Sequence, residues 1–304
     1  MIELKSLSKP LDEISALESL EAAPRSQLLE GGPGTQSGER SRSLDLLVAK
    51  GKGPSLISPL ESVIGADERQ RILDTHLSPW NMICALRMRG PSGGGAIGTG
   101  WLIGPRTVLT AGHCVYSSTF FGGWAARVEV IPGMNGGGGG PLARPFGSVV
   151  SERLSSVDRW VEAEDADFDI GCIHLDEPIG DRLGWFSLGA LAADELEGYL
   201  VNISGYPGDR GAGAEQYHSR NRILRVSERR IFYEVDTYGG QSGAPVWIHQ
   251  SEDGPPIAVG IHAYGTGGTP GSWGITANSA PRIIPEVLAQ LREWIDADGA
   301  GGKG

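Results

Sequence analysis

The chain has 304 residues, 39% of them hydrophobic, so it can form one large or two small domains with a substantial core. Its formal net charge of -11 argues against nucleic acid or an anionic membrane as the main partner. The 47 glycines and 19 prolines favour short strands and tight turns over long helices. The chain contains no run of 18 apolar residues, the length that would predict a transmembrane helix, so we expect no membrane insertion.

Residues 1–61 differ in composition from the rest of the chain. Apolar residues at helical spacing predict a short amphipathic helix over residues 4–20, carried by Leu4, Leu7, Leu11, Ile14, Leu17 and Leu20. The stretch GGPGTQSGERSRS that follows has the composition of a flexible linker. These residues therefore indicate a poorly structured pro-segment and linker, and a disordered leader without a role is the alternative. The first residues, MIELKSLSKPLDEIS, lack the pattern of a secretory signal peptide.

Short β-rich segments bounded by glycine or proline follow from Trp80 onward. They are NMICALRMR, GTGWLIG, TVLTA, RVEVIPG, DIGCIHL, YLVNISGYPG, RIFYEVDTYGG, APVWIHQ and IAVGIHAYG. The one long helix of this part of the chain is predicted at its end, over residues 281–298, where an apolar stripe runs from Ile283 to Ile295 and Pro285 falls in the first turn. The pattern predicts an all-β body with a C-terminal helix.

The chain has three cysteines, Cys84, Cys114 and Cys172, which are too few for a disulfide scaffold. No C-x-x-C pair is present, so no zinc site is predicted. We expect no metal and no cofactor in the site. The sequence contains no EF-hand-like run, but calcium binding by other residues stays open.

The stretch TAGHCVY, from Thr110 to Tyr116, places His113 beside Cys114 after an apolar run. Taken alone, His113 fits a metal ligand, a catalytic base or a satisfied core histidine. Which of these it is depends on the other groups that the fold brings within reach.

A second stretch, YGGQSGAPVW, surrounds Ser242 with glycines. Glycines on both sides let the backbone adopt positive φ and bring amide N–H groups close to a bound group, as an oxyanion site requires. An ordinary Gly-Ser turn is the alternative. The nucleophile elbow of α/β-hydrolases does not fit, because position 244 is alanine and because His113 precedes the serine.

The third stretch, DADFDIGCIHLDEP, offers an acid at the start of a predicted strand. Asp169 directly adjoins the strand from Ile170 to Leu175, and strands position groups better than loops do. We therefore favour Asp169 as the acid that orients a histidine. Asp165 is interpreted as a solvated loop residue, and so is Asp167.

Together these three segments resemble the chymotrypsin-like serine peptidases, which carry the general base, the acid and the nucleophile in that order. The resemblance covers residues 62–298. It implies two packed six-stranded antiparallel β-barrels, over residues 62–180 and 181–280, before the C-terminal helix over 281–298. It also implies His113 as base, Asp169 as acid and Ser242 as nucleophile, with the N–H groups of Gly240 and Ser242 as oxyanion hole.

One departure concerns the disulfide that usually encloses the base in this family. The partner cysteine would lie near Gly98, and no cysteine is present there. Whether Cys84 pairs with Cys114 instead stays open.

Further segments, SVIGADERQRI, ISGYPGDR and DTYGGQSGAPVW followed by GIHAYG, are similar to the glutamyl endopeptidases. In that subfamily the positions of Thr237 and His262 line the pocket for the substrate residue before the cut, P1. In PIAVGIHAYG, His262 has the opposite parity to Ile257, Val259 and Ile261, so we expect it to face a cleft. A structural histidine is the alternative.

These observations predict a serine endopeptidase that acts on proteins or peptides and prefers Glu, less readily Asp, at P1. The alternatives are a preference for small or apolar P1 residues, or an inactive peptidase fold that only binds. The composition changes at the junction Glu61–Ser62, and Glu61 is the residue type that the pocket is expected to accept, so we predict that residues 1–61 are a pro-segment of a zymogen, cut after Glu61 by this enzyme or a sibling. The resemblance implies that the free amine of Ser62 then lies near the P1 pocket, where it attracts the substrate carboxylate. The alternative is that Glu61 is one acidic residue among several in a disordered leader. We expect a monomer, and the resemblance implies a secreted, extracellular location.

Overall fold

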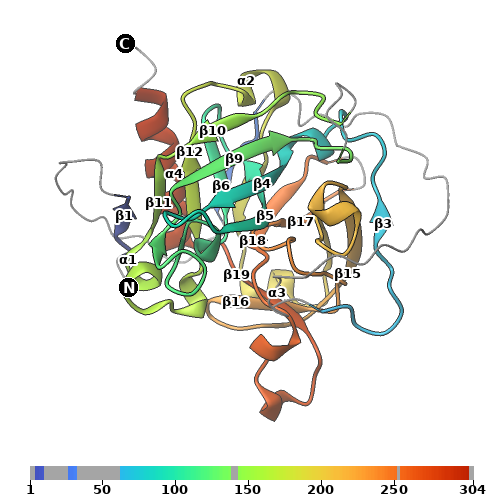
Figure 1. The fold of residues 1–304 in the computed structure, drawn as a ribbon. Helices are drawn as coiled ribbons and strands as arrows, with labels where there is room; N and C mark the ends of the chain where they lie inside the picture. Colours follow the sequence, from blue (N-terminus) through green and yellow to red (C-terminus); the bar gives the residue numbers. More distant parts are fainter. Residues whose placement is uncertain (1–3, 10–26, 33–61, 138–142, 252–253, 301–304) are drawn as a thin grey trace.

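The computed structural model describes residues 4–9, 27–32, 62–137, 143–251 and 254–300. Two β-sheets lie side by side, and one long helix, α4 (Pro285–Ala300), contacts strands of both (Figure 1). The mainly β architecture with a C-terminal helix agrees with the fold class expected from the sequence. The helix begins at Pro285, where its missing N–H and fixed φ suit the first turn.

The first sheet is antiparallel throughout and contains eight of the described strands. In spatial order these are β1 (Ser6–Ser8), β11 (Leu154–Val157), β12 (Gly171–His174), β6 (Thr107–Thr110), β5 (Gly95–Leu102), β4 (Ile83–Arg89), β9 (Arg127–Pro132) and β10 (Val149–Ser151). A small separate pair, β7 (Tyr116–Ser117) and β8 (Gly123–Trp124), follows the segment that carries His113.

The second sheet contains nine of the described strands, and only its β13–β18 pair is parallel. In spatial order these are β19 (Asn278–Pro281), β16 (Arg230–Tyr233), β15 (Tyr217–Val226), β14 (Leu200–Gly205), β17 (Pro245–Ile248), β18 (Ile257–Ile261), β13 (Ser187–Ala190) and β2 (Gln27–Leu29), with β3 (Gln70–Arg71) on β15.

Short helical turns connect the strands. The α-helices are α1 (Asp158–Ala163), α2 (Gly180–Leu183) and α3 (Ala193–Leu196), and the 3₁₀ turns are η1 (Trp80–Met82), η2 (Gly112–Cys114), η3 (Ala166–Phe168), η4 (Gly211–Gly213), η5 (Thr266–Gly268) and η6 (Gly271–Trp273). Within the described ranges, no helix is both long and apolar enough to cross a membrane.

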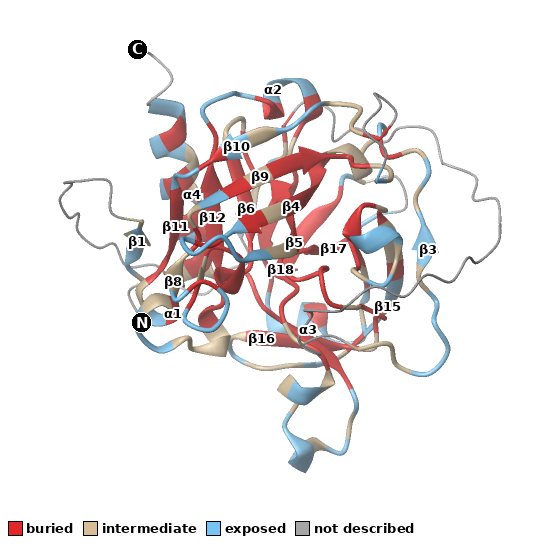
Figure 2. Cartoon of the chain, viewed as in Figure 1, coloured by how far each residue is buried: buried red, intermediate tan, exposed pale blue. Residues whose placement is uncertain are grey.

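Buried residues concentrate on the strands of both sheets (Figure 2). One apolar cluster joins the first sheet to the inner face of α4, where Leu291 and Trp294 are buried. A second cluster, which includes Val201 and Val246, fills the second sheet. Each nonpolar surface is thus removed from water by packing, which supplies most of the driving force for folding.

The helix predicted over residues 4–20 is wrong at Ser6–Ser8, which form strand β1. Leu4 and Leu7 do fit helical spacing, but here pairing with β11 outweighs the local preference. Residues 10–20, the rest of that prediction, lie outside the described residues, and so does Glu61.

Candidate active site

His113 lies in η2, directly after the buried strand β6. Ala111 is still extended, with ψ of 150°, and the chain then turns. Gly112 permits this turn to pack closely, because a Cβ there would lie 2.6 Å from the ring of Trp160. The turn therefore fixes His113 between β6 and the segment that leads into β12.

Asp169 holds His113 at two points. Its Oδ1 accepts a hydrogen bond from the backbone N–H of His113 at 2.8 Å, and its Oδ2 lies 2.7 Å from Nδ1 of the same residue. Asp169 is fully buried and comes between η3 and β12, and β12 pairs with β6. Neighbouring strands therefore bring Asp169 and His113 together, and the ring of His113 is held in one orientation.

The charge of Asp169 changes the titration of its neighbours. Burial by itself lowers the pKa of His113, but the adjacent carboxylate outweighs burial and holds the pKa well above the usual 6.5. Burial, and then the negative charge of Asp169, raise the pKa of Tyr264. Tyr264 is thus a neighbour of the acid that no sequence motif indicated.

Ser242 lies in a turn anchored to the first sheet. Its carbonyl accepts a hydrogen bond from the N–H of Thr99 at 2.8 Å, and the Thr99 hydroxyl donates to the carbonyl of Gly240 at 2.8 Å. Because Thr99 belongs to β5, the turn that carries Ser242 is tied to the sheet that carries His113 and Asp169.

Two of the three glycines around Ser242 have backbone conformations that other residues rarely adopt. Gly240 has φ of 105° and Gly243 has φ of 87°. A Cβ on Gly240 would also lie 2.6 Å from the carbonyl oxygen of Tyr206. The turn closes through a hydrogen bond from the N–H of Gln241 to the carbonyl of Tyr238 at 3.0 Å. This geometry is the kind that aims successive amides at one point.

His262 follows β18 directly, and its side chain is fully buried, which its parity in the sequence did not predict. The reason is that β18 is buried at every residue, so alternation does not separate an inner from an outer face. Nδ1 of His262 lies 2.6 Å from the Tyr233 hydroxyl. Burial, and the positive charge of His113, lower the pKa of His262 to about 3.

The backbone of His262 is also hydrogen-bonded to the two residues that follow Ser242. Its carbonyl accepts from the N–H of Gly243 at 2.7 Å, and its N–H donates to the carbonyl of Ala244 at 2.8 Å. His262 and Ser242 therefore belong to one hydrogen-bonded unit, although twenty residues separate them along the chain.

Thr237 and Ser62 meet through Asn278. The Nδ2 group of Asn278 donates to the carbonyl of Ser62 at 2.6 Å and to the Thr237 hydroxyl at 3.1 Å. The N–H of Thr237 also donates to the Ser62 carbonyl at 3.3 Å. Asn278, a fully buried residue of β19, escaped the sequence analysis because no motif surrounds it.

All three cysteines are buried free thiols, which answers the question about Cys84 and Cys114. The thiol of Cys114 points toward the carbonyl of Ser242, with Sγ at 3.7 Å. A Cβ on Gly98 would lie 2.9 Å from that sulfur, so Gly98 leaves the space that Cys114 fills. Among the described residues, no group of three or more His, Cys, Asp or Glu side chains is placed to hold a metal ion.

Comparison with known proteins identifies relatives. A family model described as a trypsin-like peptidase domain matches residues 98–259. Glutamyl endopeptidase of Bacillus licheniformis is 38% identical over 241 residues, covering 77% of this chain and 69% of the relative. A Bacillus subtilis protein named extracellular metalloprotease is 32% identical over 234 residues, with the same two coverages. The solved structure of a Glu endopeptidase in complex with MPD superposes with a TM-score of 0.62 at 26% identity, covering 77% of this chain and 99% of that one.

The fold and the matched domain define a trypsin-like serine peptidase. At 38% identity to a glutamyl endopeptidase over most of its length, the chain belongs to the glutamyl endopeptidase family and is a serine endopeptidase. The family resemblance stated from the sequence is thereby confirmed.

Proposed function

We propose that the protein is a Glu-specific endopeptidase whose nucleophile is Ser242, with His113 as base and Asp169 as acid. The observation that carries this is the two-point contact between His113 and the buried Asp169, at 2.7 and 2.8 Å. Such a contact fixes the tautomer of His113 with its proton on Nδ1, which leaves Nε2 free to accept a proton. Ser242 Oγ would then attack the substrate carbonyl as its proton passes to Nε2.

The next steps follow the same geometry. The tetrahedral intermediate develops negative charge on the former carbonyl oxygen, and the N–H groups of Gly240 and Ser242 would stabilise it. His113 then gives its proton to the leaving amine, and the acyl-enzyme on Ser242 is hydrolysed by water, with His113 again as base. Asp169 remains ionised and stabilises the imidazolium in each half of the cycle.

For specificity, we assign the P1 carboxylate to His262, Thr237 and the amine of Ser62. A pKa of about 3 keeps His262 neutral at physiological pH. When the Tyr233 hydroxyl donates to Nδ1, the single ring proton lies on Nε2, where it can donate to a carboxylate. A panel of fluorogenic peptides that differ only at P1 tests the assignment: Glu should exceed Asp, and both should exceed Gln, Ala and Leu. Equal cleavage after Gln and Glu would contradict it.

The pH dependence of the free enzyme should report the raised pKa of His113. Below its pKa this histidine carries a proton and cannot act as base, so kcat/KM should fall as pH falls. Because Asp169 raises this pKa, the acidic limb should lie above pH 6.5. Asp169→Asn should move the limb to lower pH, besides lowering the rate, whereas exposed Asp181→Asn should not. An unmoved limb in Asp169→Asn would contradict the role of the carboxylate.

Self-processing after Glu61 is a further part of the proposal. Cleavage there would leave the Ser62 amine beside Thr237, since both residues bond Asn278. We expect Glu61→Gln to remain uncut and poorly active, while Glu39→Gln matures normally, as followed by intact mass and peptidase activity. Maturation of Glu61→Gln to a Ser62 N-terminus without a helper protease would refute self-processing. Full activity in an uncut chain would refute the proposal that the full-length chain is a zymogen.

Two named relatives are peptidases, one of them called extracellular, which supports secretion of this chain and protein or peptide substrates. We further propose a monomer that binds no nucleic acid. Residues 62–180 would form the unit that carries His113 and Asp169, and residues 181–280 the unit that carries Ser242.

A further inference from the structure

Residues 4–9, in the segment that precedes Ser62, form an edge strand on the first sheet. Strand β1 pairs antiparallel with β11, so that Ser8 lies opposite Ser155. The N–H of Lys9 donates to the carbonyl of Leu154 at 2.8 Å, and the N–H of Asp158 donates to the carbonyl of Lys5 at 2.7 Å. The segment therefore adds a strand to an edge that would otherwise expose unpaired backbone groups.

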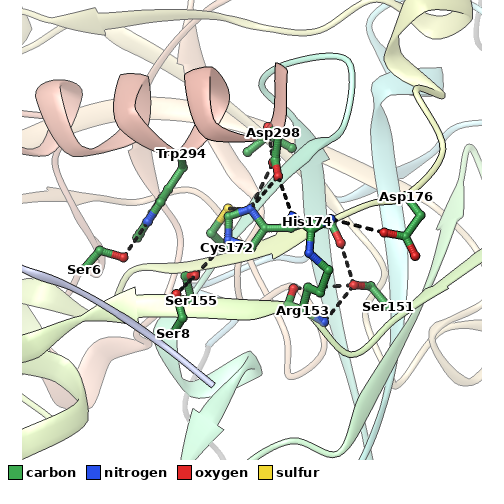
Figure 3. Close-up of polar contacts among 11 residues, drawn as sticks. Ser6, Ser8, Ser151, Arg153, Ser155, Cys172, His174, Asp176, Trp294 and Asp298 are labelled. Carbon is green, nitrogen blue, oxygen red and sulfur yellow. Dashed lines mark hydrogen bonds and ion pairs between the residues drawn. The ribbon is translucent and has the colours of Figure 1, made fainter. Parts of the chain in front are cut away.

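A chain of polar contacts connects this strand to the C-terminal helix (Figure 3). Ser8 Oγ lies 2.8 Å from Ser155 Oγ, and Ser155 Oγ lies 2.8 Å from Nε2 of His174. Nδ1 of His174 lies 2.9 Å from Asp298 of α4, whose carboxylate also accepts from the Thr107 hydroxyl at 2.7 Å. The N-terminal strand, β11, β12, β6 and α4 are thus held by one continuous network.

Two more side chains of the strand reach other parts of the first sheet and its helix. Ser6 Oγ accepts a hydrogen bond from the indole N–H of Trp294 at 2.7 Å. The ammonium group of Lys9 donates to the carbonyl of Ala126 at 2.7 Å. Among the contacts described for residues 4–9, none reaches His113, Asp169 or Ser242, so the strand docks without covering the triad.

The contacts of His174 have the same order as a catalytic triad, with an acid on Nδ1 and a serine on Nε2. Two facts assign them to structure rather than catalysis. Ser155 is only 2% exposed, and its hydroxyl also contacts Ser8, so no substrate carbonyl can approach it while β1 is in place. His174 therefore acts as a bridge between two buried strands and α4.

The same leading segment has a second anchor, on the second sheet. Strand β2 pairs antiparallel with β13, and the N–H of Gly31 donates to Ser187 Oγ at 2.7 Å. The N–H of Gly32 donates to the carbonyl of Trp185 at 3.2 Å. Any Cβ on Gly32 would overlap the Trp185 ring, so the glycine allows the close approach. Strands β1 and β2 therefore attach one segment to the outer edges of both sheets.

Two anchors on one segment bind far more tightly than either anchor alone. Once β1 is docked, residues 10–26 keep β2 near its site, and rebinding of either anchor is faster than escape of the whole segment. Loss of the segment would also leave the edges of β11 and β13 without their backbone hydrogen bonds to β1 and β2. Both effects oppose its release.

We propose that residues 1–61 stay bound as a non-covalent second chain after the cut before Ser62, seated on β11 and β13 through β1 and β2. The inference rests on the proposed function only in placing a cut there. The surface formed by β11, β13 and Trp294 of α4 is thus a docking site for this chain's own leader. The mature peptidase is a two-chain protein whose N-terminal chain stabilises it.

The test uses the full chain with Ser242→Ala, so that its own activity plays no part, and with a recognition sequence for a site-specific protease inserted between residues 50 and 56. After complete cutting, native size exclusion and intact-mass measurement follow the two chains. We expect them to co-elute and to separate only in denaturant. Prompt separation in native buffer, with residues 62–304 left monomeric and equally heat-stable, would overturn the proposal.

Variants of the strand sharpen the test. Lys9→Pro removes the N–H that bonds Leu154 and the ammonium that bonds Ala126, so the cut segment should dissociate at least about tenfold faster. Ser8→Ala should show a smaller increase, and it serves if Lys9→Pro fails to fold. Lys5→Ala, which keeps the carbonyl bonded by Asp158, is the matched control. Equal dissociation of Ser8→Ala, Lys9→Pro and Lys5→Ala would overturn the assigned contacts. Peptidase assays of the wild type test the proposed function separately.

Discussion

Replacing Ser242 by alanine is expected to lower kcat by at least about 10³-fold, because the covalent acyl-enzyme can no longer form. The residual rate would come from the oxyanion hole and substrate binding alone. Thermal unfolding should change little, since the backbone bonds that hold the turn, including that from Thr99 to the Ser242 carbonyl, do not involve the side chain. Exposed Ser251→Ala is the matched control and should keep full activity. Near-normal turnover by purified Ser242→Ala would show that the nucleophile lies elsewhere.

The triad should also behave as a unit in combination. His113→Ala should lose about as much activity as Ser242→Ala, and the double variant should lose little more, because the base has no task without the nucleophile. Additive losses in the double variant would mean that the two residues act in separate steps. Steady-state kinetics on one Glu-containing peptide suffice for this comparison.

His262→Ala is expected to reduce cleavage after Glu by about 30-fold to several thousandfold, corresponding to a loss of about 2 to 5 kcal/mol for a desolvated carboxylate left without its donor. Reaction of Ser242 with a phosphonate probe that lacks an acidic P1 group should fall much less. The comparison of the two assays separates recognition from chemistry.

Two further variants serve as comparisons for His262. Tyr233→Phe keeps the ring but removes the hydroxyl that lies 2.6 Å from Nδ1, so it should weaken Glu selectivity by less than His262→Ala does. His218→Ala removes a histidine that contacts Asn202 and should leave selectivity unchanged. If His262→Ala impaired phosphonate labelling and Glu cleavage equally, His262 would have a structural role only.

Alternating or apolar segments bounded by glycine located most of the strands correctly, including β4, β6, β12 and β18. The ten-residue strand β15 (Tyr217–Val226) was missed. Its sequence YHSRNRILRV carries three arginines and is only partly buried, so it lacks the apolar signal on which strand prediction depends. At β1 a helix was predicted where the structure has a strand. The leucine spacing favoured a helix, but pairing with the free edge of β11 placed these residues in the sheet.

The motif-bearing residues that we propose for the site could be chosen from the sequence, because glycines and strand ends mark them locally. It did not indicate Asn278, Tyr233 or Tyr264. Each of these acts through a partner far along the chain, such as Ser62 for Asn278, and such pairings depend on sheet register rather than on neighbouring residues. The burial of His262 was missed for a related reason, since parity predicts an exposed face only where one side of a strand meets water.

The free, buried cysteines affect how the structure of the enzyme responds to reducing and oxidising conditions. Burial raises the pKa of the Cys84 and Cys172 thiols, which keeps them in the unreactive protonated form. Around the base, close packing of Gly98 on Cys114 takes the place of a covalent link. The three cysteines form no disulfide that could be reduced, and the protonated thiols of Cys84 and Cys172 resist oxidation, so we expect these two sites to keep their structure in both reducing and oxidising surroundings.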